Sequence, residues 1–289
     1  RSTRRALCFG QSTDQAVCLI AFALNASSRY ALLLAGNRDE FHSRPALPAQ
    51  WWASHPDIFA GRDLDAGGTW LGVDRRGRVA AVTNYRDRPH RGPGERSRGE
   101  LSTGYLSSSM DLLAHAEQLS TQAAQFGGFN LLLFDWRNPL TPCAYLSNRH
   151  PDGTLHTPEA GIHGISNHLL NTPWPKVQRL RAAMQSAVAL ADSSPNPHSA
   201  APDTALEQLL LALEDQNPVG SPELVHAEGD QEVITRTPFI ANSVYGTRAS
   251  TVLAIERSGM LSFIERSWTW DGDKPLRSAE RRLRMNLAQ

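Results

Sequence analysis

The sequence predicts an α+β fold in which two antiparallel sheets are covered on their outer faces by helices. Segments with strand and helix character follow one another as strands, a helix, strands, two helices and strands. A parallel sheet would require strands and helices to alternate regularly, because each parallel connection needs a crossover element. The 289 residues therefore fit one large layered domain.

Two hairpins are predicted in the first third of the chain. Each consists of two apolar runs joined by a short polar segment: residues 18–24 with 30–35, and residues 69–73 with 79–83. Gly77 suits a positive φ in the second turn. Residues 41–68 contain several prolines and are expected to form a structured loop across one end of the sheet.

Three later segments carry apolar side chains at helical spacing. The predicted helices are residues 109–126, 173–191 and 205–214. Short apolar runs predict further strands at residues 129–135, 143–147, 161–167, 250–256 and 261–265. The last two strands surround Ser258-Gly259 and are expected to close the chain as a hairpin.

Charge and hydrophobicity argue against several classes of partner. The chain has 29 basic and 29 acidic residues, so bulk charge favours neither nucleic acid nor an anionic membrane. The arginine-rich residues 86–98 also include prolines and glycines, and are expected to be a solvated loop. No apolar run approaches the roughly 20 residues that span a bilayer. We expect no nucleic-acid partner and no stable membrane insertion.

Three cysteines, Cys8, Cys18 and Cys143, make an odd number without metal-ligand spacing. A disulfide scaffold and a metal site are therefore not expected, and the compartment is predicted to be reducing and cytoplasmic. The arginine-rich N-terminus has some features of a signal peptide, but Asp14 and Gln15 interrupt the pattern. The sequence lacks a haem-attachment motif, so no resident cofactor is expected, and haem stays open only as a cargo.

A polar segment directly follows the apolar residues 31–35 and indicates a candidate site. Residues 36–40 place an amide, a guanidinium and two carboxylates where the strand is expected to end. Such groups cost free energy when they are buried, unless they pair with one another or with a ligand. Cys18 begins the neighbouring strand, so its thiol is predicted to lie beside this cluster.

The same segment carries a resemblance to a known family. Its letters, Asn37-Arg38-Asp39-Glu40, spell the motif after which the NRDE family is named. The other motifs of this resemblance are Cys18-Leu19-Ile20, Gly68-Thr69-Trp70-Leu71-Gly72, Val82-Thr83-Asn84-Tyr85-Arg86, Gly164-Ile165-Ser166-Asn167 and Tyr245-Gly246-Thr247-Arg248. In order and spacing they cover residues 17–270. The chain therefore resembles the NRDE family, whose animal members are the transport and Golgi organisation type-two proteins.

This resemblance implies a branch of the N-terminal nucleophile (Ntn) hydrolase superfamily and a four-layer αββα sandwich. In that superfamily the nucleophile is the first residue of the mature chain, and its own α-amine assists it. The α-amine and a thiol have pKa values of roughly 8 and 8.5, so they can exchange a proton near neutral pH. We therefore expect residues 1–17 to be an extension and residues 18–289 to be the domain. We expect the extension to be either removed autocatalytically or never translated, with translation starting at Val17.

Comparison with the bile-salt and penicillin V amidases of the superfamily implies roles for individual residues. The residues implied in catalysis are Cys18 as the nucleophile, Arg38 and Asp39 beside it, Asn84 in the oxyanion hole, Asn167 and Arg248. Four neighbours in the same motifs are expected to bind substrate: Asn37, Glu40, Trp70 and Tyr85. The amidases have the order Gly-Arg-Asn-x-Asp at the end of the second strand. The order here differs, and because side chains alternate faces, it stays open which charged group faces the thiol.

Two functions follow from the resemblance. The first is hydrolysis of a small non-peptide amide by acyl transfer to Cys18. The second is non-catalytic binding and transfer of haem or another hydrophobic metabolite, since the animal members are associated with haem trafficking and lipid or acyl-CoA homeostasis. An apolar pocket near Trp51-Trp52 would favour this carrier function. The expected partner is accordingly a small-molecule substrate or a hydrophobic metabolite.

Overall fold

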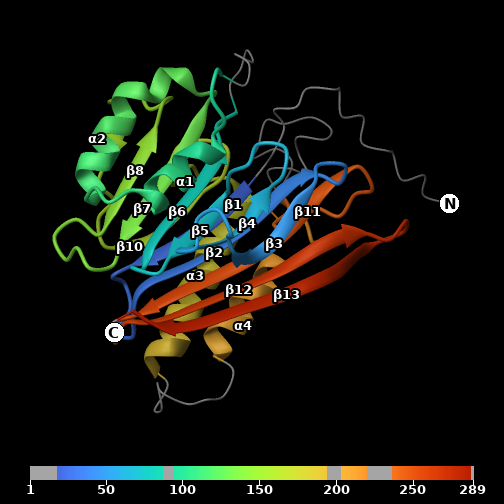
Figure 1. Ribbon diagram of the computed structural model, residues 1–289. Coiled ribbons are helices and arrows are strands. Elements are labelled where there is room, and N and C mark those ends of the chain that lie inside the picture. Colours follow the sequence, from blue (N-terminus) through green and yellow to red (C-terminus); the bar gives the residue numbers. More distant parts are fainter. Residues whose placement is uncertain (1–17, 87–93, 194–202, 220–235, 288–289) are drawn as a thin grey trace.

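A computed structural model of the protein describes residues 18–86, 94–193, 203–219 and 236–287. Within these ranges two antiparallel sheets pack face to face, and helices cover the outer side of each (Figure 1). This αββα order confirms the predicted fold class. The predicted extension lies outside the described residues, together with Cys8.

The first sheet has six strands among the described residues, in the order β10-β1-β2-β11-β12-β13. Their bounds are β1 Cys18–Leu24, β2 Tyr30–Phe41, β10 Gly161–Ile165, β11 Tyr245–Glu256, β12 Met260–Trp270 and β13 Pro275–Asn286. The first predicted hairpin is confirmed, but β2 does not end after residue 35. It pairs with β1 as far as Arg38 and with β11 as far as Phe41. The polar segment therefore lies inside a central strand.

The second sheet has seven strands in the described part of the chain, in the order of their numbers from β3 to β9. Their bounds are β3 Ala46–Trp51, β4 Ile58–Asp63, β5 Leu71–Asp74, β6 Arg78–Asn84, β7 Phe129–Asp135, β8 Cys143–Ser147 and β9 Leu155–His156. The prediction of a loop over residues 41–68 was wrong, because β3 and β4 lie there. Pro48 is compatible with β3 since this strand is at the sheet edge, and the register shifts between Leu47 and Gln50.

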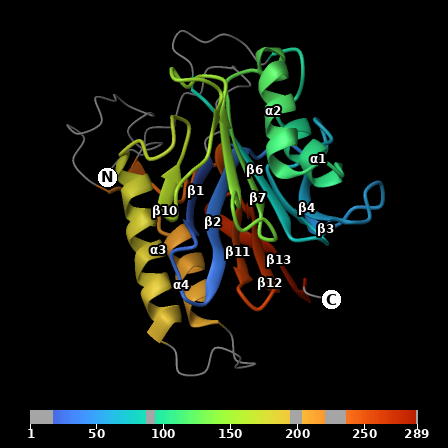
Figure 2. The ribbon, with the colours of Figure 1, turned by 90° about the vertical axis from the view of Figure 1, so that its left-hand side faces the viewer.

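Helices cover the outer face of each sheet (Figure 2). Helices α1 Gly99–Ser107 and α2 Leu112–Gln122, with the 3₁₀ turn Ala123–Gln125, pack on the second sheet, and α3 Pro175–Ser193 and α4 Thr204–Leu213 pack on the first. The three predicted helices correspond to α2, α3 and α4. Helix α1 was missed, because its two glycines lower helix propensity. No helix in the described ranges combines the length and apolar character needed to cross a membrane.

The predicted closing hairpin is also incomplete, because β13 follows it as a third strand. This strand contains four arginines and is exposed along most of its length. An edge strand pairs on one side only, and charged side chains there discourage pairing with another chain. The apolar pattern that identified the other strands is therefore weak in β13.

Strand β2 is buried on both of its faces. Leu32 and Leu34 pack in the core between the sheets, whereas Leu33 and Ala35 pack against α3 and α4. Since side chains alternate along a strand, the polar residues that follow must also divide between these two faces. This division determines the composition of the site.

The close approach of α1 to the β4–β5 connection yields a prediction about two glycines. A Cβ at Gly68 would lie 2.5 Å from the carbonyl carbon of Gly99, whereas a Cβ at Gly104 would meet nothing within 4 Å. Gly68→Ala should lower the free energy of unfolding by about 2 kcal/mol because it overpacks backbone against backbone. Gly104→Ala should raise it by about 0.5–1 kcal/mol through helix propensity. Urea unfolding of both variants checks the opposite signs, and equal effects would contradict the close packing.

Candidate active site

A cavity of about 490 Å³ lies between the sheets, beside the start of β1. Cys18 pairs with Arg38, Arg38 with Ala249, and Ala249 with Ser267, so these residues form one row across four strands. All four line the cavity. The small side chains of Ala249 and Ser267 leave space beside the guanidinium of Arg38, which is how the row creates a hollow.

Cys18 is the first residue of β1 and is only 5% exposed. Ser166, which follows β10, donates a hydrogen bond from its Oγ to the Cys18 carbonyl at 2.6 Å and anchors the start of the strand. Burial raises the pKa of the Cys18 thiol to about 12, and the negative charge of Asp39 adds to this, whereas Arg38 acts in the opposite direction. With residue 17 bonded to it, Cys18 therefore keeps its thiol proton at neutral pH.

The NRDE segment divides between the two faces of β2. Asn37 lies on the helix side, where its Nδ2 donates to the carbonyls of Leu213 at 2.8 Å and Pro238 at 2.9 Å. The Asn37 amide, expected to bind substrate, holds the end of α4 and is not among the residues that line the cavity. Side chains alternate between the two faces of β2, and the sequence left open which of them face the thiol. The side chain of Asn37 points away from it.

Asp39 lies two residues after Asn37 and is therefore on the same face of β2, yet it also lines the cavity. Its Oδ1 accepts a hydrogen bond from Thr247 Oγ1 at 2.6 Å, and its Oδ2 has no hydrogen-bond partner among the described residues. Burial raises the pKa of Asp39 above the ordinary range of a carboxyl, and the positive charge of Lys176 is the largest opposing influence. Asp39 therefore connects the helix face with the surroundings of Cys18.

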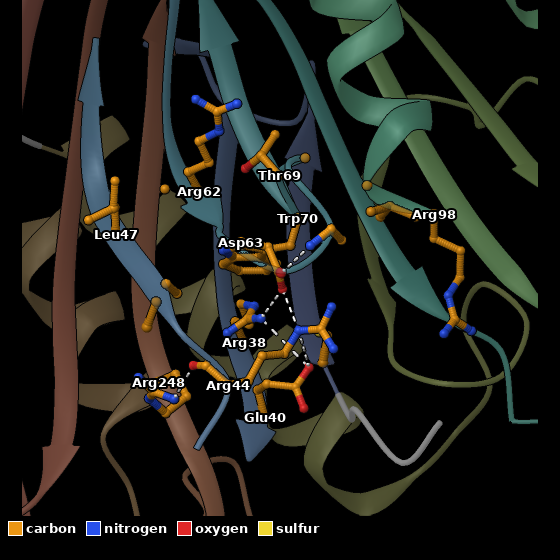
Figure 3. Close-up of a pocket in the computed structure, with 18 of the residues that line it drawn as sticks. Arg38, Glu40, Arg44, Leu47, Arg62, Asp63, Thr69, Trp70, Arg98 and Arg248 are labelled. Carbon is orange, nitrogen blue, oxygen red and sulfur yellow. Dashed lines mark hydrogen bonds and ion pairs between the residues drawn. The ribbon is translucent and has the colours of Figure 1, made fainter. Parts of the chain in front are cut away.

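Arg38 and Glu40 face the cavity and belong to an ion-pair network (Figure 3). Arg38 Nη2 and Arg44 Nε both contact Asp63 Oδ2, at 2.8 and 2.6 Å, and both lie within 3.7 Å of Glu40 Oε2. Although burial acts to raise it, the hydrogen bond from Arg44 holds the pKa of Asp63 below its ordinary value. The guanidinium of Arg38 is thereby held in place beside Cys18.

Asn84 and Asn167 occupy different places. Asn84, at the end of β6, lines the cavity, whereas Asn167 does not. Asn167 donates from Nδ2 to the Asn84 carbonyl at 3.0 Å, and its Oδ1 lies 3.1 Å from Ser166 Oγ. It therefore links the end of β6 to the residue that anchors Cys18. Tyr85 stacks with His168, at 5.1 Å between ring centroids, outside the cavity lining.

Arg248 and Trp70 both line the cavity (Figure 3). Arg248 lies where β11 shifts register, and its Nη1 donates to the carbonyls of Phe41, His42 and Arg44 at 2.8–3.2 Å. The guanidinium thus closes the turn between β2 and β3. Trp70 is 9% exposed and forms part of the wall.

Sequence reasoning missed several residues of this site. Asp63 and Arg44 lie in the region predicted to be a loop, and Arg96 and Arg98, which also line the cavity, lie in a stretch predicted to be solvated. Glu265 of β12 is 1% exposed at the cavity wall and was not singled out. The charged pair Arg62-Asp63 directly after an apolar run was a usable signal, of the same kind as the NRDE segment.

The burial of the Glu265 carboxylate costs free energy. Its Oε1 accepts a hydrogen bond from the Ala49 amide at 2.7 Å, but its Oε2 has no hydrogen-bond partner in the described ranges. Burial raises the pKa of Glu265 to about 6. A buried carboxylate with a free oxygen on a cavity wall is an acceptor available to a ligand.

The cavity differs from the apolar pocket that would favour a carrier. Neither Trp51 nor Trp52 lines it, and Trp52 donates its Nε1 proton to the Ala60 carbonyl at 3.0 Å. The lining instead contains arginine and carboxylate side chains from several strands. Among the described residues, no group of three or more His, Cys, Asp or Glu side chains could hold a metal ion.

The described residues form αββα layers, and Cys18 stands at the start of β1. Similar solved structures include a Caenorhabditis elegans N-acylethanolamine-hydrolyzing acid amidase orthologue, with a TM-score of 0.47 and 10% identity over 82% of this chain and 92% of that chain. A mutant of the conjugated bile acid hydrolase from Clostridium perfringens has a TM-score of 0.44 and 8% identity over 93% of this chain and 97% of that chain.

The family is defined by sequence. Residues 17–270 match the family described as Transport and Golgi organisation 2. Similar curated proteins are the Transport and Golgi organization 2 homologues of Mus musculus and Homo sapiens, each 32% identical over 265 residues, which cover 87% of this chain and 93% of the relative. The Drosophila melanogaster protein is 26% identical over 281 residues, covering 88% of this chain and 93% of the relative. The chain belongs to the Transport and Golgi organisation 2 family.

The position of Asn37 predicts a stability effect. Asn37→Ala leaves the buried carbonyls of Leu213 and Pro238 without a donor, so the free energy of unfolding should fall by about 2–3 kcal/mol. Asn217→Ala, at an exposed amide, is the matched control and should change it by less than about 0.5 kcal/mol. Urea denaturation measures both, and equal losses would show that the Asn37 amide does not hold the end of α4.

Glu265 predicts a pH dependence of stability. Its pKa is raised from 4.5 to about 6 on folding, so the folded state binds this proton more tightly than the unfolded state. The resulting stabilisation is complete below about pH 4.5 and is lost as the pH rises through about 6. Glu265→Gln, which mimics the protonated form, should therefore be more stable than the parent by about 2 kcal/mol at pH 7.

Urea unfolding between pH 4 and 8 checks this effect, and the two proteins should converge near pH 4. Glu117→Gln, at an exposed position of α2, controls for the loss of one carboxylate. A Glu265→Gln protein that is less stable than the parent at pH 7 would show that the ionised carboxylate is well paired.

Proposed function

We propose that this protein is a cysteine-nucleophile hydrolase that acts on a small, polar, non-peptide amide. The observation that carries the proposal is that Cys18, at the first position of β1, shares a cavity with Arg38 of the neighbouring strand and with Asn84 of β6. A thiol at the start of a strand can have a free α-amine once the preceding residues are absent. The cytoplasmic location expected from the sequence is part of the same proposal.

The proposed reaction proceeds by acyl transfer. The α-amine of Cys18 takes the thiol proton, and the sulfur attacks the amide carbonyl carbon. The C–N bond then breaks, the leaving amine takes the proton, and the acyl group stays on sulfur as a thioester. Water, deprotonated by the same α-amine, attacks the thioester, and the carboxylic acid leaves while the thiol recovers its proton.

The neighbours of Cys18 supply the electrostatics of this reaction. Asn84 is a neutral donor on the cavity wall, suited to the oxyanion because it stabilises negative charge without losing a proton. Arg38 lies on the same face as the thiol and favours the thiolate, as its effect on the pKa of Cys18 indicates. The charged lining supports a polar substrate, because an apolar ligand would leave these groups desolvated.

The second candidate function, binding and transfer of haem or another hydrophobic metabolite, has one observation in its favour. While residue 17 is attached, the pKa of the Cys18 thiol is raised to about 12, which leaves a poor nucleophile at neutral pH. A chain that keeps its extension would then bind rather than turn over. The two functions differ in whether they require a free α-amine at Cys18.

Mass spectrometry and thiol labelling test the proposal. The purified protein should have the mass of a chain that begins at Cys18, and iodoacetamide should label that residue at neutral pH. Cys18→Ala should lose this labelling, whereas Cys143→Ala should keep it, because Cys143 is 1% exposed in the inter-sheet core.

A mass that retains residues before Cys18 would contradict the α-amine mechanism. Saturable haem binding that is unchanged by Cys18→Ala, in a protein whose Cys18 is not labelled, would support the carrier function instead.

A further inference from the structure

The choice of basic residues singles out one lysine. Of the 29 basic residues, 27 are arginine and only Lys176 and Lys274 are lysine. Lys274 lies exposed in the turn before β13, whereas Lys176 is 0% exposed. Arginine stays charged in essentially every protein environment, but a buried lysine can lose its proton. A lysine buried inside a protein whose other basic residues are nearly all arginine indicates that a basic group able to lose its proton is required there.

The fold carries Lys176 to the helix face of the site. It is the second residue of α3, directly after Pro175, whose fixed φ suits the first turn of a helix. The next residue, Val177, packs with Leu19 of β1 in the core beneath the helix. Lys176 thus enters the layer between α3 and the sheet, on the side to which Asp39 is also turned.

Lys176 and Asp39 each have a buried polar atom in this layer without a hydrogen-bond partner among the described residues. Among the described residues none pairs with Lys176 Nζ, and none pairs with Asp39 Oδ2. Both side chains are fully buried. A purely structural buried pair would be expected to satisfy these atoms, because each unsatisfied charged group costs several kcal/mol. The incomplete pairing indicates that the two groups respond to a third charge.

The candidate for that third charge is Cys18, which lines the same cavity as Asp39. Burial lowers the pKa of Lys176, and negative charge on Asp39 and on Cys18 opposes this, while Arg86 adds to the lowering. On β2, the charges of Asp39 and Glu40 disfavour the Cys18 thiolate, and that of Arg38 favours it. A thiolate at Cys18 together with a carboxylate at Asp39 would bring two negative charges to the wall of one cavity.

We propose that Lys176 is a positioning residue whose ammonium allows the Cys18 thiolate and the Asp39 carboxylate to be present together. The proposal rests on the role of Cys18 as the nucleophile. Lys176 does not touch the reacting atoms and forms no bond. Its positive charge acts on Asp39 and on the electrostatic potential at the Cys18 sulfur, so that the thiol gives up its proton at a lower pH.

Because the chain has only two lysines, NMR can follow Lys176 directly. Labelling with [¹³Cε]lysine should give two signals, which Lys274→Arg assigns. The Lys176 signal should titrate at a lower pH than the Lys274 signal, and Asp39→Asn should lower the Lys176 midpoint further, by about one pH unit, through loss of the opposite charge. Titration of both lysines at the same pH, or no response to Asp39→Asn, would overturn the proposal.

The pH profile of Cys18 alkylation tests the effect on the nucleophile. Lys176→Met should raise the midpoint of iodoacetamide labelling by about one pH unit, and Lys176→Arg, which keeps the charge, should restore it to the parent value. Lys274→Met is the matched control and should leave the midpoint unchanged. An unchanged midpoint in Lys176→Met, or equal shifts in the Met and Arg variants, would overturn the proposal.

The two proposals fail in different ways. If the lysine signals and the alkylation midpoints respond as expected but amides are not hydrolysed, the coupling holds and the hydrolase function falls. If amides are hydrolysed with a Cys18 dependence but Lys176→Met leaves the pH profile of hydrolysis unchanged, the positioning role falls and the hydrolase function holds.

Discussion

The burial of β2 on both faces is the constraint on which the rest of the site depends. A central strand has no face toward water, so every polar side chain of its NRDE segment must find a partner inside the protein. Asn37 finds backbone carbonyls at the end of α4, and Arg38 finds Asp63. Asp39 finds Thr247, with one oxygen left over. Within this segment one atom each of Asn37 (Oδ1), Arg38 (Nη1) and Asp39 (Oδ2) has no hydrogen-bond partner among the described residues.

The incomplete pairing has a common pattern. Asp39, Lys176 and Glu265 are fully or almost fully buried, and each has a polar atom without a hydrogen-bond partner among the described residues. Well-packed apolar side chains at these positions would be less costly to bury. Groups of this kind persist where function requires them and are compensated by the surrounding packing. Here the compensation comes from three apolar cores that enclose both sheets.

Regular elements were predictable where one physical signal dominated. Helices α2, α3 and α4 showed clear helical periodicity, and the first two hairpins showed apolar runs with turn residues between them. The signal failed where local features conflicted with the fold: prolines in an edge strand at β3, glycines in α1, and arginines along β13. In each case tertiary contacts override a weak local preference. Tertiary contacts likewise extend β2 through the polar segment, where the local sequence predicts that the strand ends.

The sequence by itself determined the family, the αββα layers and the pairing of Cys18 with the strand that carries Arg38, because adjacent strands of a hairpin are neighbours in space. Only the tertiary structure decided which side chains reach the cavity. A shift of one residue along a strand exchanges its two faces, so Arg38 rather than Asn37 lies beside the thiol. Glu265 comes from a distant segment that packing alone brings to the cavity, and the sequence offers no spacing that would join it to Cys18.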